Sequence, residues 1–188
     1  HLSEDAIATY EAMNGLTRER MLKGIWCEAE GAVYSEFRDD VHICTRCKSD
    51  KRPQRCPRVW SGDGQFKMRY CVRGIDFGYN DPFVCLWAAL DEDKRLLFYK
   101  LHYARKRIVS DHAAVIKNRN GKDPVAWTVA DHDAEDAATL RREGVPTRPA
   151  KKDRPIKAGC DRVMKRLLVE DDGRPRLEVC KFLSPMLD

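Results

Sequence analysis

The order of apolar runs and breaks between Tyr70 and Phe182 constrains the fold of this chain more than any other feature. Three β-prone runs with short connections come first, and helical and β-prone segments alternate after them. Short connections are typical of antiparallel strands, whereas helical crossovers are typical of parallel strands. The pattern predicts an α/β fold in which a three-strand antiparallel meander and a following αβαβα unit form one mixed sheet, flanked by helices.

Turn and capping residues set the bounds of the expected elements, since Gly144 ends one helix and Pro155 suits the first turn of another. The expected strands are Tyr70–Asp76, Phe83–Leu90, Arg95–Tyr103, Val125–Ala130 and Val145–Ala150, with Leu177–Phe182 as a further candidate. The expected helices are Ile108–Asn118, Ala134–Glu143 and Pro155–Val169. We expect Trp87 and Trp127 to be core or packing residues on strands, and His112 to lie on the surface of its helix.

Composition narrows the class of protein. The chain has 188 residues, of which 43% are hydrophobic and 35% charged, with a formal net charge of +5. This fits one domain with an appendage, and a mildly basic charge is compatible with nucleic acid as a partner. No apolar stretch approaches the roughly 18 residues that span a bilayer, so we expect no membrane partner. The chain begins at His1 rather than Met, which suggests a piece of a longer protein.

Two acidic residues stand at the ends of expected strands. Asp76 ends the first strand and Asp131 directly follows the fourth. Each alone could be a turn residue or a helix N-cap. In this strand order, however, the two strands can lie side by side, and converging carboxylates favour a bound cation. The pair predicts a site for Mg²⁺ or Mn²⁺ and phosphodiester chemistry, in which one ion activates a water and another stabilises the leaving oxygen.

Other residues close to Asp131 are weaker candidates for the metal site. Asp133 could be a further ligand, but it and the two acids after it also suit the start of a helix. His132 could touch the metal or the leaving group, although a single histidine is more often structural.

A cysteine-rich, basic loop precedes the regular part of the chain. Cys44 and Cys47 have the spacing of a zinc knuckle, and Cys56 and Cys71 could complete a four-thiolate site, with His42 as a competing ligand. A structural zinc ion would let this Pro-containing loop fold. The alternative is a flexible basic loop with incidental thiols.

Basic residues that follow the expected fifth strand could contact DNA phosphates without reading sequence. They are Lys151, Lys152, Arg154 and Lys157. For Arg162 and Lys165, farther along the same helix, we favour a solvated helix face.

Several of these segments together resemble one known family. They are Gly24-Ile-Trp26, Glu30-Gly-Ala-Val-Tyr34 with Phe37, Gly74-Ile-Asp-Phe-Gly-Tyr-Asn-Asp-Pro82, Val129-Ala-Asp-His-Asp-Ala-Glu-Asp136 and Ala150-Lys-Lys152. The family is the C-terminal nuclease domain of the bacteriophage terminase large subunit. The resemblance implies a ribonuclease H-like fold and a two-metal DNA endonuclease that cuts concatemeric viral genomes. It also implies that Asp76 and Asp131 are the first two metal-binding acids.

The same resemblance implies a third acid late in the domain, which we expect beyond Asp188, since Asp188 itself is a weak substitute. It further implies double-stranded viral DNA, a portal, a small terminase subunit and an ATPase motor domain as partners, and work in the host cytoplasm at the procapsid. We divide the chain into linker helices and a connecting segment (1–43), the Cys-rich loop (44–68) and the nuclease core (69–188). The alternatives are a junction-resolvase-like nuclease and a zinc-stabilised, non-catalytic DNA-binding module.

Overall fold

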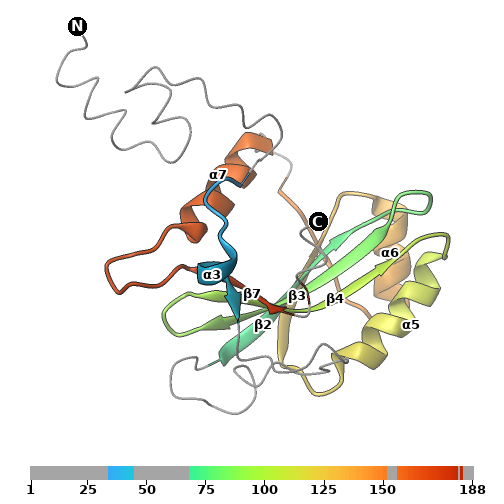
Figure 1. The fold of residues 1–188 in the computed structure, drawn as a ribbon. Helices are drawn as coiled ribbons and strands as arrows, with labels where there is room; N and C mark the ends of the chain where they lie inside the picture. Colours follow the sequence, from blue (N-terminus) through green and yellow to red (C-terminus); the bar gives the residue numbers. More distant parts are fainter. Residues whose placement is uncertain (1–33, 45–67, 152–155, 182, 184–188) are drawn as a thin grey trace, which may run out of the picture.

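The computed structural model describes residues 34–44, 68–151, 156–181 and 183. Its centre is a seven-stranded mixed sheet with the strand order β1-β7-β4-β3-β2-β5-β6 (Figure 1). Strands β2 (Met68–Asp76), β3 (Phe83–Asp91) and β4 (Leu96–Ala104) form the antiparallel meander. The α/β class and the meander that the sequence predicts are therefore confirmed, and each of these strands lies within two residues of its expected bounds.

Helices and parallel strands alternate after the meander. They are α5 (Val109–Asn120), β5 (Val125–Ala130), α6 (Ala134–Arg142), β6 (Arg148–Pro149), α7 (Ile156–Leu167) and β7 (Leu177–Cys180). Strand β5 pairs parallel to β2, β6 parallel to β5, and β7 parallel to β4. In the part of the chain described, no helix combines the length and apolar character needed to cross a bilayer.

The sixth strand is much shorter than the expected Val145–Ala150. Only Arg148 and Pro149 pair with β5. Val145 is buried, and its N–H donates to the Leu140 carbonyl at 2.8 Å, so it closes the end of α6 instead of joining the sheet. Proline has no N–H to give to a ladder, which limits strand pairing at this edge.

Each face of the sheet has its own hydrophobic cluster. The larger cluster joins Trp87 and Phe83 of the meander to Ile116 of α5 and Leu140 of α6. The smaller cluster lies on the other face, beneath α7. Figure 1 shows α5 and α6 next to each other on one side of the sheet and α7 away from them. Trp87 is fully buried in the core, whereas Trp127 on β5 is 36% exposed and packs against a tyrosine of β2, so Trp127 is a packing residue outside the core.

A short helix and strand from the N-terminal segment also join the sheet. Helix α3 (Asp39–His42) leads directly into β1 (Ile43–Cys44), which pairs parallel to β7 at the sheet edge. Buried His42 links α3 to α7, because its Nε2 donates to the Leu167 carbonyl at 2.7 Å. The sheet thus includes residues that the sequence assigned to a linker, while the domain division itself stays a prediction.

Two histidines meet beneath the first turn of α5. His102 Nε2 on β4 lies 2.9 Å from His112 Nδ1, and the Phe83 ring stacks on His112 with 3.9 Å between ring centroids. Both are almost fully buried, so the expected surface position of His112 is wrong: this position of the helix faces the sheet. Burial and the proximity of His112 lower the pKa of His102 to about 4, and burial also lowers the pKa of His112.

A buried polar network lies near the opposite end of α5. The Asp123 carboxylate accepts hydrogen bonds from Tyr99 Oη at 2.8 Å and from Lys100 Nζ at 2.6 Å. Its side chain is 1% exposed, so the carboxylate depends on these two donors for the hydrogen bonds that water would otherwise supply. Burial, together with the nearby Cys71 and Asp123, raises the pKa of Tyr99, which keeps its hydroxyl a donor.

Candidate metal and catalytic site

The structure brings Asp76 and Asp131 to neighbouring positions. Asp76 is the last residue of β2, and Asp131 directly follows β5, its parallel neighbour. The register pairs Ile75 with Ala130, and the Asp131 N–H donates to the Ile75 carbonyl at 3.0 Å, which continues the ladder past the strand end. The two acids therefore follow paired residues at the same end of the sheet.

Strand alternation also puts both acids on one face. Cys71 and Ile75 of β2 are in the larger cluster, as is Ala130 of β5. Since successive side chains in a strand point to opposite faces, Asp76 and Asp131 belong to the face away from α5 and α6. Asp76 is exposed, and the Asp131 side chain is 45% exposed, so solvent and a ligand can reach both carboxylates.

Backbone and side-chain contacts orient Asp131. Its Oδ1 accepts the His132 N–H at 2.7 Å and also contacts His132 Nδ1. The imidazole is exposed and lies against the carboxylate, so His132 stays close to the site that the sequence predicts.

The acids after His132 serve the start of a helix. Asp133 is the N-cap of α6, and its Oδ1 accepts the N–H groups of Glu135 and Asp136 at 3.1 and 3.0 Å. Burial, followed by the neighbouring carboxylates of Asp133 and Glu135, raises the pKa of Asp136. A metal role for Asp133 stays a prediction, and Asp188 lies outside the described residues.

The donor chemistry of the pair fits a hard cation. Mg²⁺ prefers oxygen ligands and is often bound through one or two carboxylates, with waters and substrate phosphates completing the set. Asp76 and Asp131 offer such oxygens on an accessible face. Within the described residues, no group of three or more His, Cys, Asp or Glu side chains could hold a metal ion. Among the described residues, the candidate metal site therefore consists of the two carboxylates of Asp76 and Asp131.

The proposed four-cysteine zinc site is not assembled. Cys44 lies on β1 and Cys71 on β2, and three other strands separate these two in the sheet. Four strand spacings amount to about 19 Å, whereas two thiolates on one zinc ion lie within about 4.6 Å of each other. The set with Cys44 and Cys71 is therefore wrong, because the sheet holds these residues apart. Cys47 and Cys56 lie outside the described residues.

His42 and Cys71 have other contacts that explain their positions. The His42 ring is held by backbone groups at both nitrogens, since its Nδ1 also accepts the Arg38 N–H at 2.9 Å. The Tyr99 hydroxyl lies 3.1 Å from the fully buried Cys71 sulfur, and burial raises the pKa of this thiol to about 11. A thiol with so high a pKa is a poor metal ligand at neutral pH.

Of the two basic candidates among the described residues, Lys151 lies just after β6, the strand that is paired with β5. The Ala150 N–H donates to the Ala130 carbonyl at 2.9 Å, so Lys151 and Asp131 follow residues that are joined to each other. Lys151 and Lys157 are both exposed. Lys152 and Arg154 lie outside the described residues, and DNA binding by all four stays a prediction.

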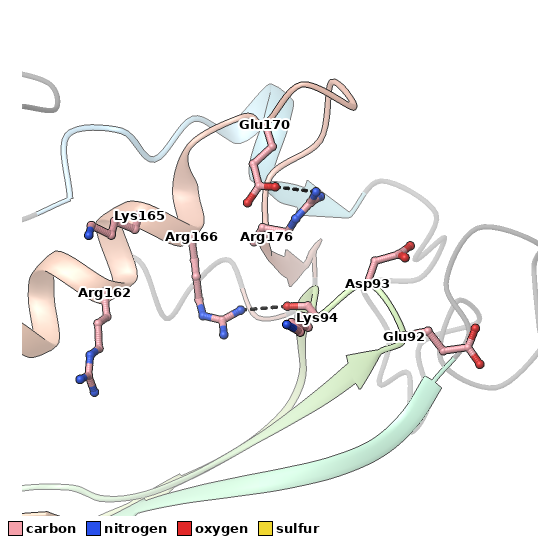
Figure 2. Close-up of a pocket in the computed structure, with 8 residues that line it drawn as sticks. All are labelled: Glu92, Asp93, Lys94, Arg162, Lys165, Arg166, Glu170 and Arg176. Atoms are coloured by element: carbon pink, nitrogen blue, oxygen red, sulfur yellow. Dashed lines mark hydrogen bonds and ion pairs between the residues drawn. The ribbon is translucent and has the colours of Figure 1, made fainter. Parts of the chain in front are cut away.

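A pocket of about 600 Å³ lies at the other end of the sheet (Figure 2). It is lined by the β3–β4 turn, by α7 and by the segment between α7 and β7, through Glu92, Asp93, Lys94, Arg162, Lys165, Arg166, Glu170 and Arg176. Asp91, beside this turn, pairs with Met68 at the start of β2, about 27 Å along the strand from Asp76. The pocket is therefore separate from the carboxylate pair.

Trp127 is exposed on the same face of the sheet as Asp76 and Asp131, which the sequence did not predict. It precedes Asp131 by four residues, so the alternation of side chains along β5 places both on one face. We call this face of β2 and β5, which carries Asp76 and Asp131 and points away from α5 and α6, the open face. The sequence does not indicate which face of β5 is exposed, because the larger apolar side chains, Trp127 and Val129, are the exposed ones, and Thr128 and Ala130 are buried.

The strand order, the parallel β2–β5 pair and the acids at their ends define a ribonuclease H-like fold. Among solved structures, this fold is that of the nuclease domain of bacteriophage large terminases. No protein-family model and no curated protein sequence matches the chain.

Three of the similar structures illustrate the match. A large terminase from a thermophilic bacteriophage superposes with a TM-score of 0.65 at 16% identity, over 99% of this chain and 43% of that one. The P22 large terminase nuclease domain gives 0.59 at 16% identity, over 84% and 76% of the chains. The nuclease of the thermophilic phage G20c large terminase with bound zinc gives 0.51 at 20% identity, over 82% and 85%. This chain thus spans less than half the length of the first of these three proteins.

Proposed function

We propose that this chain is the metal-dependent DNA endonuclease domain of a viral DNA-packaging terminase. The observation that carries the proposal is the juxtaposition of Asp76 and Asp131 at the ends of two paired parallel strands. It gains support from the fold, which is that of phage terminase nuclease domains. The substrate is double-stranded viral DNA, and the reaction is phosphodiester hydrolysis with Mg²⁺ or Mn²⁺.

The residues of the chain have distinct parts in this reaction. Asp76 and Asp131 would hold the cations, and cations bound there would supply positive charge to offset the negative charge that builds on the phosphate and on the departing 3′ oxygen. The sheet fixes both carboxylates before substrate arrives, because each backbone is held in the β2–β5 ladder. Lys151, exposed at the same sheet end, binds a phosphate beside the one that is cut. Contacts of this kind give affinity without sequence preference.

The test is nicking of supercoiled plasmid with Mn²⁺, with Mg²⁺ or with EDTA, for the wild type, Asp76→Asn and Asp131→Asn. We expect metal-dependent cutting by the wild type only. The matched control is Asp171→Asn, since Asp171 is exposed in the turn between α7 and β7 and lies outside the carboxylate site. Cutting retained in both site variants would refute the assignment, provided that circular dichroism shows all proteins folded.

The partners and location of the whole protein belong to the same proposal. We infer that the chain is joined to an ATPase motor domain, consistent with its covering 43% of the thermophilic-phage large terminase described above. The complete protein then works with a portal and a small terminase subunit on concatemeric genomes, at the procapsid in the host cytoplasm. Co-purification of the full-length protein with portal particles, dependent on the motor segment, is the expected result.

A further inference from the structure

Two exposed aromatic side chains share the face of the carboxylate pair, one along β5 and one across the sheet on β4. Trp127 is 36% exposed and Tyr103 is 55% exposed. Trp127 pairs with Val72, which precedes Asp76 by four residues and so shares its face of β2. Across the sheet, Asp76 of β2 pairs with Val84 of β3, and Val84 pairs with Tyr103 of β4. Tyr103 therefore also belongs to the face that carries the acids.

The distances suit contacts with one nucleic-acid strand. Trp127 lies about 13 Å along β5 from Asp131, and Tyr103 lies two strand spacings, or about 10 Å, from Asp76. On β2, Gly74 lies between Asp76 and the residue that pairs with Trp127. Nothing lies within 4 Å of where a Gly74 Cβ would be, so the surface between the ring and the acids is open to a ligand. Either ring is therefore within a few nucleotides of a phosphate bound at the carboxylates.

The surroundings of the rings suit a polyanion. Tyr70 packs on Trp127 with 5.0 Å between ring centroids, and the Arg69 guanidinium lies 6.0 Å from the Tyr70 ring. Arg148 of β6 is exposed and pairs with Val129, so it shares the open face with Trp127. Cations beside aromatic rings are typical of surfaces that bind single-stranded nucleic acid, where phosphates meet the charges and bases stack on the rings.

We propose that the open face of β2 and β5 binds a DNA strand with unpaired bases, and that Trp127 stacks on one of these bases near the cut. The inference rests on the nuclease function proposed above and adds a substrate class to it. In a paired duplex the faces of the bases are stacked on one another, so an aromatic side chain gains little from them. DNA with local unpairing is the preferred substrate, and Trp127 is a positioning residue for it.

The experiment compares two synthetic duplexes of one sequence, one fully paired and one with a short block of mismatches. Cleavage with Mn²⁺ is measured for the wild type, Trp127→Ala, Trp127→Phe and Tyr103→Ala. Binding is measured in the Asp76→Asn background, which removes cutting. The matched control is Tyr34→Ala, because Tyr34 is an aromatic residue of similar exposure, 41%, that lies beside Cys160 of α7 and not on β2 or β5. The urea midpoint of every variant reports on folding.

We expect the wild type to cut the mismatched duplex faster. Trp127→Ala should weaken binding of that duplex on the order of tenfold, a loss typical of one base–aromatic stack, and should leave the paired duplex nearly unaffected. Trp127→Phe and the Tyr34 variant should keep the preference, and Tyr103→Ala should reduce it. Equal cutting of both duplexes by the wild type, or equal losses on both in Trp127→Ala, would overturn the inference.

Failure of the nuclease assignment gives a different result. If the folded wild type cuts neither duplex with any metal, the proposed function fails, while the binding comparison still decides the role of Trp127. A Trp127-dependent preference for mismatched DNA without cleavage then supports the binding surface alone. No difference in affinity between the two duplexes refutes it. If Trp127→Ala does not fold, Trp127→Leu, which keeps an apolar side chain but cannot stack on a base, and Tyr103→Ala carry the same comparison.

Discussion

The buried pair of His102 and His112 makes the stability of this domain depend on pH in a definite direction. The pKa of His102 is about 4 in the fold, compared with 6.5 for an unperturbed histidine. Because the folded state binds the proton more weakly than the unfolded state, the stabilisation is complete above pH 6.5. It is lost as the pH falls from 6.5 towards 4. From these values, His102 alone lowers the free energy of unfolding by about 3 kcal/mol between neutral pH and pH 4.

The nearby arginine side chains lower the pKa values of both histidines as well. Besides burial and His112, the guanidinium groups of Arg119 and Arg107 lower the pKa of His102. Around His112, burial and Arg107 lower the pKa, while the Arg107 carbonyl and Asp111 partly oppose them. A loss of about 3 kcal/mol is large against the roughly 5–15 kcal/mol that a domain has in total.

The assay is urea unfolding followed by circular dichroism, at several pH values between 7.5 and 4, for the wild type and His102→Gln. Acidic conditions also protonate carboxylates, so the informative quantity is the difference in slope between the two proteins. We expect the variant to be less stable at neutral pH and to lose less stability on acidification. Parallel slopes for the wild type and His102→Gln would refute the reasoning.

Two further substitutions test other parts of the structure. Asp123→Asn removes the buried charge that accepts hydrogen bonds from Tyr99 and Lys100. We expect the free energy of unfolding in urea titrations to fall by about 2–4 kcal/mol. An unchanged urea midpoint would show that these hydrogen bonds do not stabilise the fold. Gly78→Ala places a Cβ 2.6 Å from the Asp81 carbonyl oxygen, so the backbone just after the first acid must shift. We expect a loss of about 1–3 kcal/mol and slower plasmid nicking, and wild-type values for both would show that the loop adapts freely.

The meander and the convergence of the two acids could be predicted because the signals are local. Apolar runs of about eight residues with short turns between them leave few ways to pair β2, β3 and β4. Because β5 follows a helix, a parallel strand is expected, and once β5 lies next to β2 the acid after it, Asp131, must approach Asp76. The prediction needed only the order of the elements and the place of each acid in its strand.

Long-range contacts explain what the sequence did not reveal. Strand β1 is two residues long and is held by pairing with β7, far along the chain, so it has no periodicity to detect. The cysteine spacing suggested zinc because it ignores the strands that carry Cys44 and Cys71. His112 looked like a surface residue because its burial depends on a partner, His102, from another element. Pattern analysis cannot supply such partners.

The two ends of the strand order carry a consequence for how copies of this domain can meet. Both terminal strands, β1 and β6, have only two residues, and β6 ends in Pro149. Short edges and proline discourage one sheet from extending into another. Copies of this domain at high local concentration would therefore not readily join through the edges of the described sheet, and contacts between them would use side-chain surfaces instead.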